Sequence, residues 1–233
     1  FMAEKKYTPM MQHYLKMKEE NPDAILFYRL GDFYEMFFED AKLVSQELDL
    51  VLTGRSAGVE EKVPMCGVPF HAANSYIQRL VKKGYKVAIC EQLEDPSSAK
   101  GLVDRGIIKI ITPGTYMDAT MDAKSTNYMA SCEISSFEIT VIYCELSTGE
   151  LKYQTLQRSL VSLQKALLEQ NVSELVCPMT MDKKWMAALE EMAAMVISKH
   201  KKANIDSEDL PLLNGIESES LKEAFALLMA YLK

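Results

Sequence analysis

The sequence is poor in the residues that build disulfides and metal centres. Its 233 residues include five cysteines and three histidines, all scattered, and no Cys-x-x-Cys pair occurs. An odd number of isolated cysteines argues against a disulfide framework, and widely separated histidines argue against a zinc site. These absences favour a protein of the reducing cytoplasm that holds no structural metal.

Long apolar runs and phosphate-binding loops are also missing. The longest apolar run, Ala224 to Leu232, is far shorter than the ~20 residues of a membrane span. We therefore expect neither export nor a membrane partner. No Gly-x-x-x-x-Gly-Lys-[Ser/Thr] sequence occurs, so we expect no ATPase and no cofactor within these residues.

Positive charge is scarce overall but unevenly distributed. The net charge of −7 argues against a general nucleic-acid binder. Between Gly54 and Ile110, however, there are nine Lys and Arg against six Asp and Glu, whereas from Asp118 onward there are eleven against seventeen. The run Arg79 to Lys86 holds four cations and no anion, which on charge alone is typical of a solvated helix face.

The first half alternates helices and strands, a pattern typical of α/β proteins. Thr8 before Pro9 predicts a helix start, and Asp32 is expected to cap a second helix. The expected elements are a helix from residue 8, a strand at 24–28, a helix from 32 to about 48, a polar loop at 53–62, a helix at 72–83, and strands at 86–90 and 107–111.

The second half has a different rhythm, which predicts a second domain. Thr112-Pro113-Gly114-Thr115 breaks the pattern, and we assign residues 1–115 to one domain, 116–125 to a linker and 126–233 to another. Strands are expected at 128–134, 138–146 and 150–156, followed by elements at 160–170 (helix), 174–177 (strand), 184–195 (helix), 196–198 (strand) and 218–231 (helix). Three antiparallel strands followed by αβ units indicate a ribonuclease H-like mixed sheet.

The segment Gly31-Asp32-Phe33-Tyr34-Glu35-Met36-Phe37 follows the first strand and has two interpretations. In the first, Asp32 and Glu35 form an acidic variant of the capping box at the start of a helix, and Phe33 packs nearby. In the second, Phe33 is an exposed wedge that enters DNA, and Glu35 contacts the base that the wedge meets. Spacing alone favours the capping box, because such matches are common.

The wedge interpretation rests on the mechanics of the duplex. An apolar side chain inserted between base steps kinks DNA at a cost of a few kcal/mol per step. A mispaired or unpaired base is already poorly held, so the same kink costs less there. A carboxylate beside the wedge repels the phosphates of a well-stacked duplex, yet it accepts a hydrogen bond from a displaced base, or donates one if protonated.

Further motifs extend the match well beyond this segment. They are Thr8-Pro9-Met10-Met11-Gln12, Pro64-Met65-Cys66-Gly67-Val68-Pro69-Phe70-His71-Ala72, Lys83-Gly84-Tyr85-Lys86-Val87-Ala88-Ile89-Cys90-Glu91-Gln92, Glu94-Asp95-Pro96, Ile111-Thr112-Pro113-Gly114-Thr115 and Leu146-Ser147-Thr148-Gly149-Glu150. In order and spacing they resemble the bacterial MutS family of DNA mismatch repair proteins. The resemblance is specific over residues 8–115 and looser, but collinear, over 126–233.

The resemblance implies a fold and a site. The fold is α/β, with an N-terminal mixed-sheet mismatch-recognition domain and a ribonuclease H-like connector domain. Phe33 would stack on the mismatched base and Glu35 would hydrogen-bond to it, with Leu30 beside the wedge where the family more often has methionine. Residues expected more weakly to line the groove or contact phosphates are Arg55, Ser56, Pro64, Met65 and Arg105. Phe70 replaces the usual tyrosine and so lacks a hydroxyl.

The resemblance also implies partners. MutS proteins carry ATPase, dimerising and clamping parts downstream, so this chain looks like an N-terminal fragment of a longer parent. ATP, Mg²⁺ and homodimerisation are expected only for that parent, whereas mismatched double-stranded DNA would bind here. The connector would meet the partner protein MutL. The expected location is the bacterial cytoplasm, at the nucleoid when bound to DNA.

Two other functions compete with mismatch recognition. A metal-dependent nuclease would need carboxylates that converge on two divalent ions, and the expected strands offer Glu133, Glu138 and Glu145. A protein-interaction module would instead use a surface of the second domain, such as the helix at 218–231 or the loop around Asn214 and Gly215.

Overall fold

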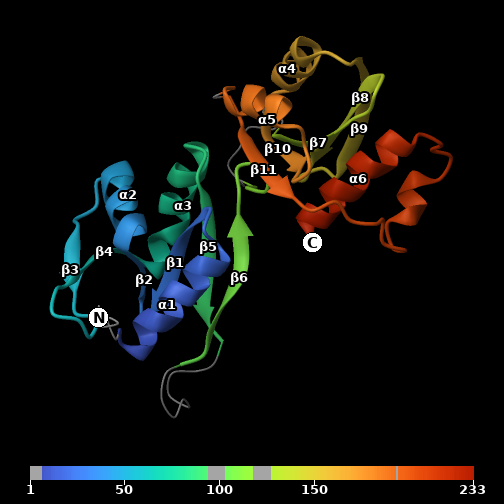
Figure 1. The fold of residues 1–233 in the computed structure, drawn as a ribbon. Helices are drawn as coiled ribbons and strands as arrows, with labels where there is room; N and C mark the ends of the chain where they lie inside the picture. The colour runs from blue at the N-terminus through green and yellow to red at the C-terminus, as the bar shows by residue number, and fades with distance from the viewer. Residues whose placement is uncertain (1–6, 94–102, 118–126, 193) are drawn as a thin grey trace, which may run out of the picture. The chain divides into compact units, whose positions relative to one another are not determined.

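The computed structural model describes residues 7–93, 103–117, 127–192 and 194–233. The chain forms two compact units, Phe1–Tyr116 and Met117–Lys233, each with its own sheet and helices (Figure 1). The change from one unit to the next falls at the start of the predicted linker 116–125. Residues 118–125 of that linker, and the motif Glu94-Asp95-Pro96, lie outside the described residues.

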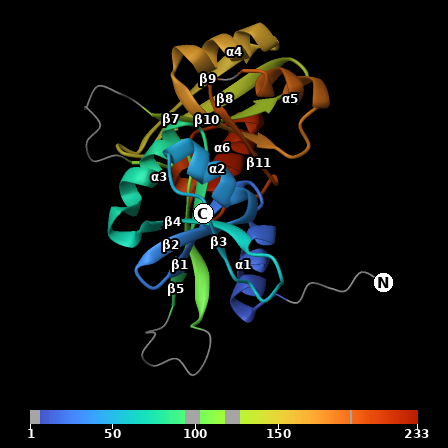
Figure 2. The same cartoon turned by 90° about the vertical axis from the view of Figure 1, so that its left-hand side faces the viewer.

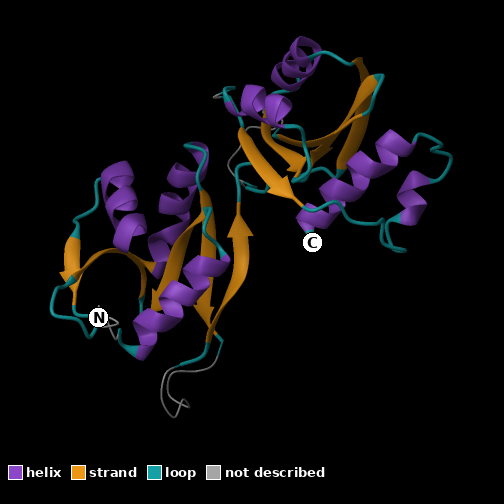
Figure 3. Ribbon diagram, viewed as in Figure 1, coloured by secondary structure: helices purple, strands orange, loops and turns teal. Residues whose placement is uncertain are grey.

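The first unit is built on a six-stranded mixed sheet with the order β3-β4-β2-β1-β5-β6. β1 pairs antiparallel with β2 and parallel with β5, and β4 pairs antiparallel with both β2 and β3. The elements are α1 (Pro9–Glu20), β1 (Ala24–Leu30), β2 (Phe33–Phe37), α2 (Phe38–Leu48), β3 (Thr53–Arg55), β4 (Val63–Pro69), the 3₁₀ turn η1 (Phe70–Ala72), α3 (Ala73–Lys82), β5 (Lys86–Gln92) and β6 (Arg105–Ile111) (Figure 3).

Apolar side chains alternate along the strands and fill a core on each face of this sheet. One face packs under α1, where Met11 and Tyr14 meet Leu26, Tyr28 and Phe37. The other face packs under α2 and α3, whose buried residues include Val44, Ile77 and Leu80. Figure 2 shows α1 and α3 on opposite sides of the strands. Both faces of this sheet are therefore largely covered by helices.

The predicted helix start at Asp32 is wrong. Phe33–Phe37 forms strand β2, and α2 begins only at Phe38. Gly31, with a φ of +59°, and Asp32 form the turn that folds β2 back on β1. Glu35 is therefore a mid-strand residue rather than the third residue of a helix, so the capping-box interpretation fails.

The second unit is built on a five-stranded mixed sheet with the order β11-β10-β7-β8-β9. β7, β8 and β9 are antiparallel, whereas β10 runs parallel to β7 and β11 parallel to β10. The elements are β7 (Tyr128–Ile134), β8 (Glu138–Glu145), β9 (Glu150–Gln157), α4 (Leu160–Glu169), β10 (Val172–Pro178), α5 (Lys183–Glu190), β11 (Val196–His200), the 3₁₀ turn η2 (Leu210–Leu213) and α6 (Glu219–Leu232). The predicted two-part α/β fold is confirmed.

Helices cover both faces of the second sheet. α4 and α5 pack on the face that carries Ala130, Val141 and Leu175, and α6 packs on the other. Six residues of α6 are buried, namely Leu221, Ala224, Phe225, Ala226, Leu227 and Leu228. The helix at 218–231, suggested above as a partner surface, is thus chiefly a core element.

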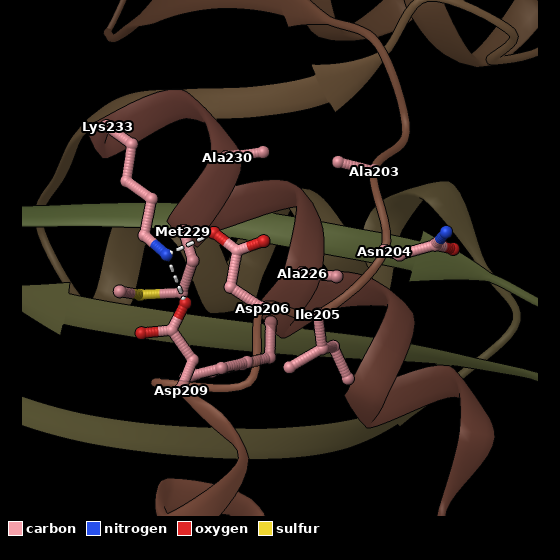
Figure 4. A pocket seen from close by; sticks show the side chains of 10 residues that line it. Ala203, Asn204, Ile205, Asp206, Asp209, Ala226, Met229, Ala230 and Lys233 are labelled. Atoms are coloured by element: carbon pink, nitrogen blue, oxygen red, sulfur yellow. Dashed lines mark hydrogen bonds and ion pairs between the residues drawn. The ribbon is translucent and has the colours of Figure 1, made fainter.

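A small cavity of about 60 Å³ lies beside the last turn of α6. Figure 4 shows Lys233 reaching across it to two carboxylates. The Lys233 Nζ lies 2.5 Å from Asp206 Oδ2 and 2.7 Å from Asp209 Oδ2, and these hydrogen bonds raise the pKa of Lys233. The charged groups that line this cavity are therefore paired with one another within the chain.

Candidate nucleic-acid interface

The tip of the β1–β2 hairpin presents one large aromatic ring to solvent. Phe33 is 46% exposed, although it lies within a strand whose next residue, Tyr34, is buried. Leu30 faces it across β1 and Pro69 across β4. Both neighbours are apolar, so the Phe33 ring is flanked by apolar side chains while almost half of its surface remains exposed at the end of the sheet.

A polar network on the opposite face of β1 and β2 stiffens this hairpin. Arg29 donates from Nε to the Gly31 carbonyl (2.5 Å) and from Nη1 to Glu91 Oε1 (3.3 Å), and the Tyr34 hydroxyl also donates to Glu91. The Arg29 guanidinium lies 3.8 Å from the centre of the Phe70 ring, a cation–π contact. The turn below Phe33 is thereby tied to β5 and to η1.

The carboxylate of Glu35 lies on the same face of β2 as Phe33, since side chains two apart in a strand point the same way. It forms an ion pair with Arg55 of β3. Their side chains are 15% and 37% exposed, respectively. The guanidinium of Arg55 is therefore partly open to solvent, whereas the Glu35 side chain is mostly covered.

Gly67 of β4 leaves room between the ring and the carboxylate. It pairs with Glu35, and a Cβ placed there would lie 3.2 Å from the Tyr34 carbonyl oxygen, 3.4 Å from Glu35 Cγ and 3.8 Å from Phe33 Cδ1. The first of these distances is tighter than ordinary van der Waals contact. A side chain at Gly67 would thus press on the backbone of β2 between the two candidate residues, while its contacts with Phe33 and Glu35 themselves would be ordinary ones.

The remaining residues that were predicted to contact DNA lie on different faces of the first sheet and differ in exposure. Met65 lies on the face of Phe33 and Glu35, half-buried in the core under α1. Pro64 immediately precedes Met65 in β4 and so points to the other face. Ser56 is exposed just after β3, within reach of solvent near Arg55.

Arg105 does not fit its predicted role. It is buried, and its guanidinium donates to the carbonyls of Arg29 (2.9 Å) and Val103 (2.8 Å). It also lies 5.4 Å from the ring centre of Tyr28. The guanidinium of Arg105 links β6 to β1 inside the domain. This buried position argues against a contact between Arg105 and a DNA phosphate.

Arg29 and Glu91 also belong to this site, although the sequence pattern does not single them out. Both come from strands with buried neighbours, and nothing in their spacing reveals that β1 and β5 are adjacent. Parallel pairing of these strands brings together residues 62 positions apart, which only the folded sheet provides. A charged residue inside an otherwise apolar strand was the one available signal.

The three carboxylates suggested for a nuclease do not converge: Glu138 lies two residues from the cross-strand partner of Glu133, but Glu145 lies at the other end of β8. Glu133 and Glu145 belong to paired strands, but Glu133 pairs with Thr140 and Glu145 with Tyr128, so they lie ~17 Å apart along the ladder at ~3.4 Å per residue. Glu133 is paired with Lys202 (2.9 Å). Across the described part of the chain, no group of three or more His, Cys, Asp or Glu is placed to hold a metal ion.

Glu145 instead closes the β8–β9 turn, and we expect its titration to show this. Its carboxylate accepts hydrogen bonds from Ser147 Oγ (2.7 Å), Thr148 N (2.9 Å) and Thr148 Oγ1 (2.5 Å). The bonds from Thr148 and Ser147 lower the pKa of Glu145. A lowered folded-state pKa means that this contribution to stability is present above the ordinary pKa of glutamate and is lost as pH falls through the folded value.

The measurement is an NMR pH titration of the Glu145 side chain. Thr148→Val removes one donor, and we expect it to raise the pKa of Glu145 toward its ordinary value. Thr155→Val, on the neighbouring strand, serves as the control and should leave that titration unchanged. An identical Glu145 titration in the Thr148→Val variant would show that the turn does not hold the carboxylate.

The fold and this site define a two-unit α/β protein that has an exposed aromatic ring at the end of its first sheet and a largely covered carboxylate on the same face. Residues 8–120 match the family model of MutS domain I. The chain belongs to the MutS family and matches its N-terminal part. 

Relatives at high identity span both units. The chain is 46% identical over 231 residues to the DNA mismatch repair protein MutS of Bacillus licheniformis, covering 97% of this chain and 26% of that protein. It is 45% identical over 230 residues to MutS of Clostridium tetani, covering 96% of this chain and 25% of the relative. MutS of Clostridium botulinum (strain Loch Maree) is 61% identical over 144 residues, or 61% of this chain and 16% of the relative. The chain thus spans about a quarter of the length of the first two relatives.

No helix in the described ranges is long and apolar enough to cross a membrane.

Proposed function

We propose that this chain recognises mispaired or unpaired bases in double-stranded DNA during mismatch repair, by inserting Phe33 as a wedge and offering Glu35 to the displaced base. The observation that carries the proposal is the exposure of Phe33 at the end of a hairpin whose other large side chains are mostly buried. Relatives named as mismatch repair proteins support the same conclusion.

The selectivity of the wedge comes from the deformability of the duplex. Inserting a ring costs a few kcal/mol of lost stacking per step, and a mismatch lowers that cost because its base is weakly held. The network of Arg29, Tyr34 and Glu91 keeps the hairpin rigid. The Phe33 ring is therefore preorganised for insertion, and binding DNA costs little conformational entropy in the hairpin.

Glu35 has to exchange its partner when DNA binds. In the free chain it is paired with Arg55. A displaced base with a ring N–H can take the place of the guanidinium on the carboxylate, and Arg55 is then free to meet a phosphate. On a matched duplex no base is displaced, and the carboxylate only repels the backbone.

Substituting Glu35 with glutamine tests this exchange. We expect affinity for a matched duplex to rise about three- to tenfold, because a repulsion worth ~1 kcal/mol is removed. Affinity for a G·T duplex should change much less, so the preference for the mismatch falls. The free energy of unfolding should fall by only about 1 kcal/mol, because glutamine keeps an acceptor for Arg55 and loses only the charge of this partly covered pair.

Fluorescence anisotropy titrations with labelled G·T and matched duplexes, at one salt concentration, measure the ratio of the two affinities. The matched control is Glu39→Gln, which removes a carboxylate that is 84% exposed at the start of α2 and should alter neither affinity. If Glu35→Gln lowers the affinities for both duplexes equally, or leaves the ratio of the two affinities unchanged, the proposed role of Glu35 is wrong.

The activities that these 233 residues do not account for would come from the rest of a longer parent protein. We propose that a longer parent binds ATP and Mg²⁺, forms a homodimer and clamps the DNA, and that its second unit meets MutL. The present chain would then need no cofactor and would bind DNA weakly by itself, since few of its cations neutralise phosphates. The bacterial cytoplasm, at the nucleoid, is the proposed location.

A further inference from the structure

The turn that leads into α6 contains the one Asn-Gly pair of the chain, Asn214 and Gly215. The five other asparagines are followed by residues that carry side chains, namely Pro22, Ser75, Tyr128, Val172 and Ile205. Asparagine is one of the thermally labile residues of proteins, because the backbone nitrogen of the next residue can attack its side-chain amide. Glycine in that next position has no Cβ to obstruct the attack. The pair is therefore the asparagine sequence of this chain that is most open to the reaction.

Leu213 to Ile216 form a type II β-turn with this pair at its centre. The Ile216 N–H donates to the Leu213 carbonyl (3.0 Å). Asn214 has a φ of −58° and a ψ of 126°, and Gly215 has a φ of +82°, which is the combination that defines this turn. Both central residues are exposed, and a Cβ built at Gly215 would meet no heavy atom within 4 Å beyond its chain neighbours. The reacting groups thus lie in open solvent.

The nitrogen that would attack is not engaged. Among the residues that the structure describes, the Gly215 N–H donates to no acceptor, so no hydrogen bond has to break at that atom. Attack requires rotation about the Cα–C bond of Asn214, until the Gly215 nitrogen lies beside the side-chain carbonyl carbon. This rotation opens the turn hydrogen bond of Ile216, which is a single bond at the surface, and the conformational freedom of glycine lets the chain follow.

We propose that Asn214 is a site of spontaneous deamidation. The Gly215 nitrogen forms a bond to the side-chain carbonyl carbon of Asn214 and gives its proton to water, while the amide nitrogen takes up a proton and leaves as ammonia. The product is a five-membered succinimide ring. Water then adds to either carbonyl of the ring and opens it, to aspartate or to isoaspartate, and no oxidant or cofactor is needed. The proposal does not depend on DNA recognition, since both residues lie in the second unit.

The isoaspartate product alters the turn, because its main chain runs through the former side chain and gains one CH₂ group. The turn is anchored at both ends. Buried Leu213 and half-buried Ile216 pack in the core beneath α6, the cluster that contains Leu221 and Phe225. A longer main chain displaces this hydrogen-bonded turn and with it the packing of the two side chains, so we expect α6 to be held less firmly. Aspartate, by contrast, is a common turn residue and leaves the main chain as it was.

The test is to age the purified 233-residue chain for several weeks in neutral buffer and to map the products by tandem mass spectrometry. We expect a mass gain of about 1 Da, the difference between an amide and a carboxyl group, in the peptide that contains Asn214. Transfer of a methyl group by a protein isoaspartyl methyltransferase then measures the isoaspartate content. Asn74 is the internal control, because it is exposed but lies in α3 and precedes a serine; its modification should be at least fivefold lower. Asn214→Gln keeps an amide that would have to close a less favourable six-membered ring, and it should show no gain at position 214.

Urea unfolding gives the second readout, followed by the emission of Trp185, the one tryptophan of the chain. We expect the midpoint of the aged chain to fall as its isoaspartate content rises. Freshly purified Asn214→Asp carries the new charge without the longer main chain and should keep the midpoint of the fresh chain, and Asn214→Gln should unfold at the same midpoint before and after ageing. Modification of Asn214 no greater than that of Asn74 would overturn the proposal. An unchanged midpoint in a chain rich in isoaspartate would overturn the inferred effect on α6.

Discussion

Replacing Phe33 with alanine is expected to remove most of the preference for mismatched over matched DNA. Stacking of a base on an aromatic side chain contributes about 1–3 kcal/mol by alanine substitution, which corresponds to roughly five- to 150-fold in affinity. That loss should fall on the G·T duplex. The matched duplex, into which the ring does not insert, should lose far less.

A chimera makes the measurement robust. Residues 8–233 of this chain, which belongs to the MutS family, would replace the matching part of Bacillus licheniformis MutS, and the affinities for both duplexes would be measured with and without the substitution. Tyr153→Ala is the matched control, since Tyr153 is a 61% exposed aromatic residue of β9 in the second unit. An unchanged mismatch preference in the Phe33 variant would refute the wedge role.

Replacing Asp40 with alanine is expected to cost the first unit about 2–4 kcal/mol of stability. The Asp40 carboxylate is buried and links three elements. Oδ2 accepts from the backbone N–H of Leu26 in β1 (2.9 Å), and Oδ1 accepts from Lys18 Nζ of α1 (3.0 Å). Without it, a buried N–H loses its acceptor and α1 loses its link to α2, which is a large effect for a domain of typical marginal stability.

Urea unfolding followed by two probes isolates this effect. Far-UV circular dichroism reports on both units, whereas Trp185 emission reports on the second unit alone, because the chain has no other tryptophan. We expect Asp40→Ala to lower the urea midpoint of the first unit, which is followed by circular dichroism. The midpoint of the Trp185 emission change should stay the same. Glu39→Ala, one residue earlier but 84% exposed at its side chain, should change stability by less than about 0.5 kcal/mol. A similar loss in both variants would mean that the buried links of Asp40 are not important.

Much of the fold was predictable because its elements carry strong local signals. The apolar run from Ala24 and the cap at Thr8 gave elements close to those observed, and all eight helices and strands expected in the second unit are present. In that unit, local propensity and tertiary pairing agree, which is the condition under which sequence patterns suffice.

The errors in the first unit arose where tertiary pairing overrides local pattern. Asp32 and Glu35 have capping-box spacing, yet pairing with β1 and β4 makes their segment a strand. β4 was not predicted, because Pro64, Gly67 and Pro69 oppose strand formation in isolation. Its position between β2 and β3 compensates for that weak propensity.

The candidate site was predictable as residues but not as contacts. Phe33 and Glu35 were identified by their motif and the resemblance that surrounds it. The ion pair between Glu35 and Arg55 depends on the register of β2, β3 and β4, which no local pattern contains. The same holds for the burial of Arg105 against the carbonyl of Arg29.

The most direct test of the account is a photochemical cross-link from position 33. Phe33 is replaced by p-benzoylphenylalanine in the chimera, the complex with a G·T duplex is irradiated, and the linked nucleotide is identified by sequencing. The account predicts a cross-link at the mispaired base or the adjoining step, and little cross-linking to a matched duplex. Equal cross-linking to both duplexes, or linkage only to distant nucleotides, would contradict it.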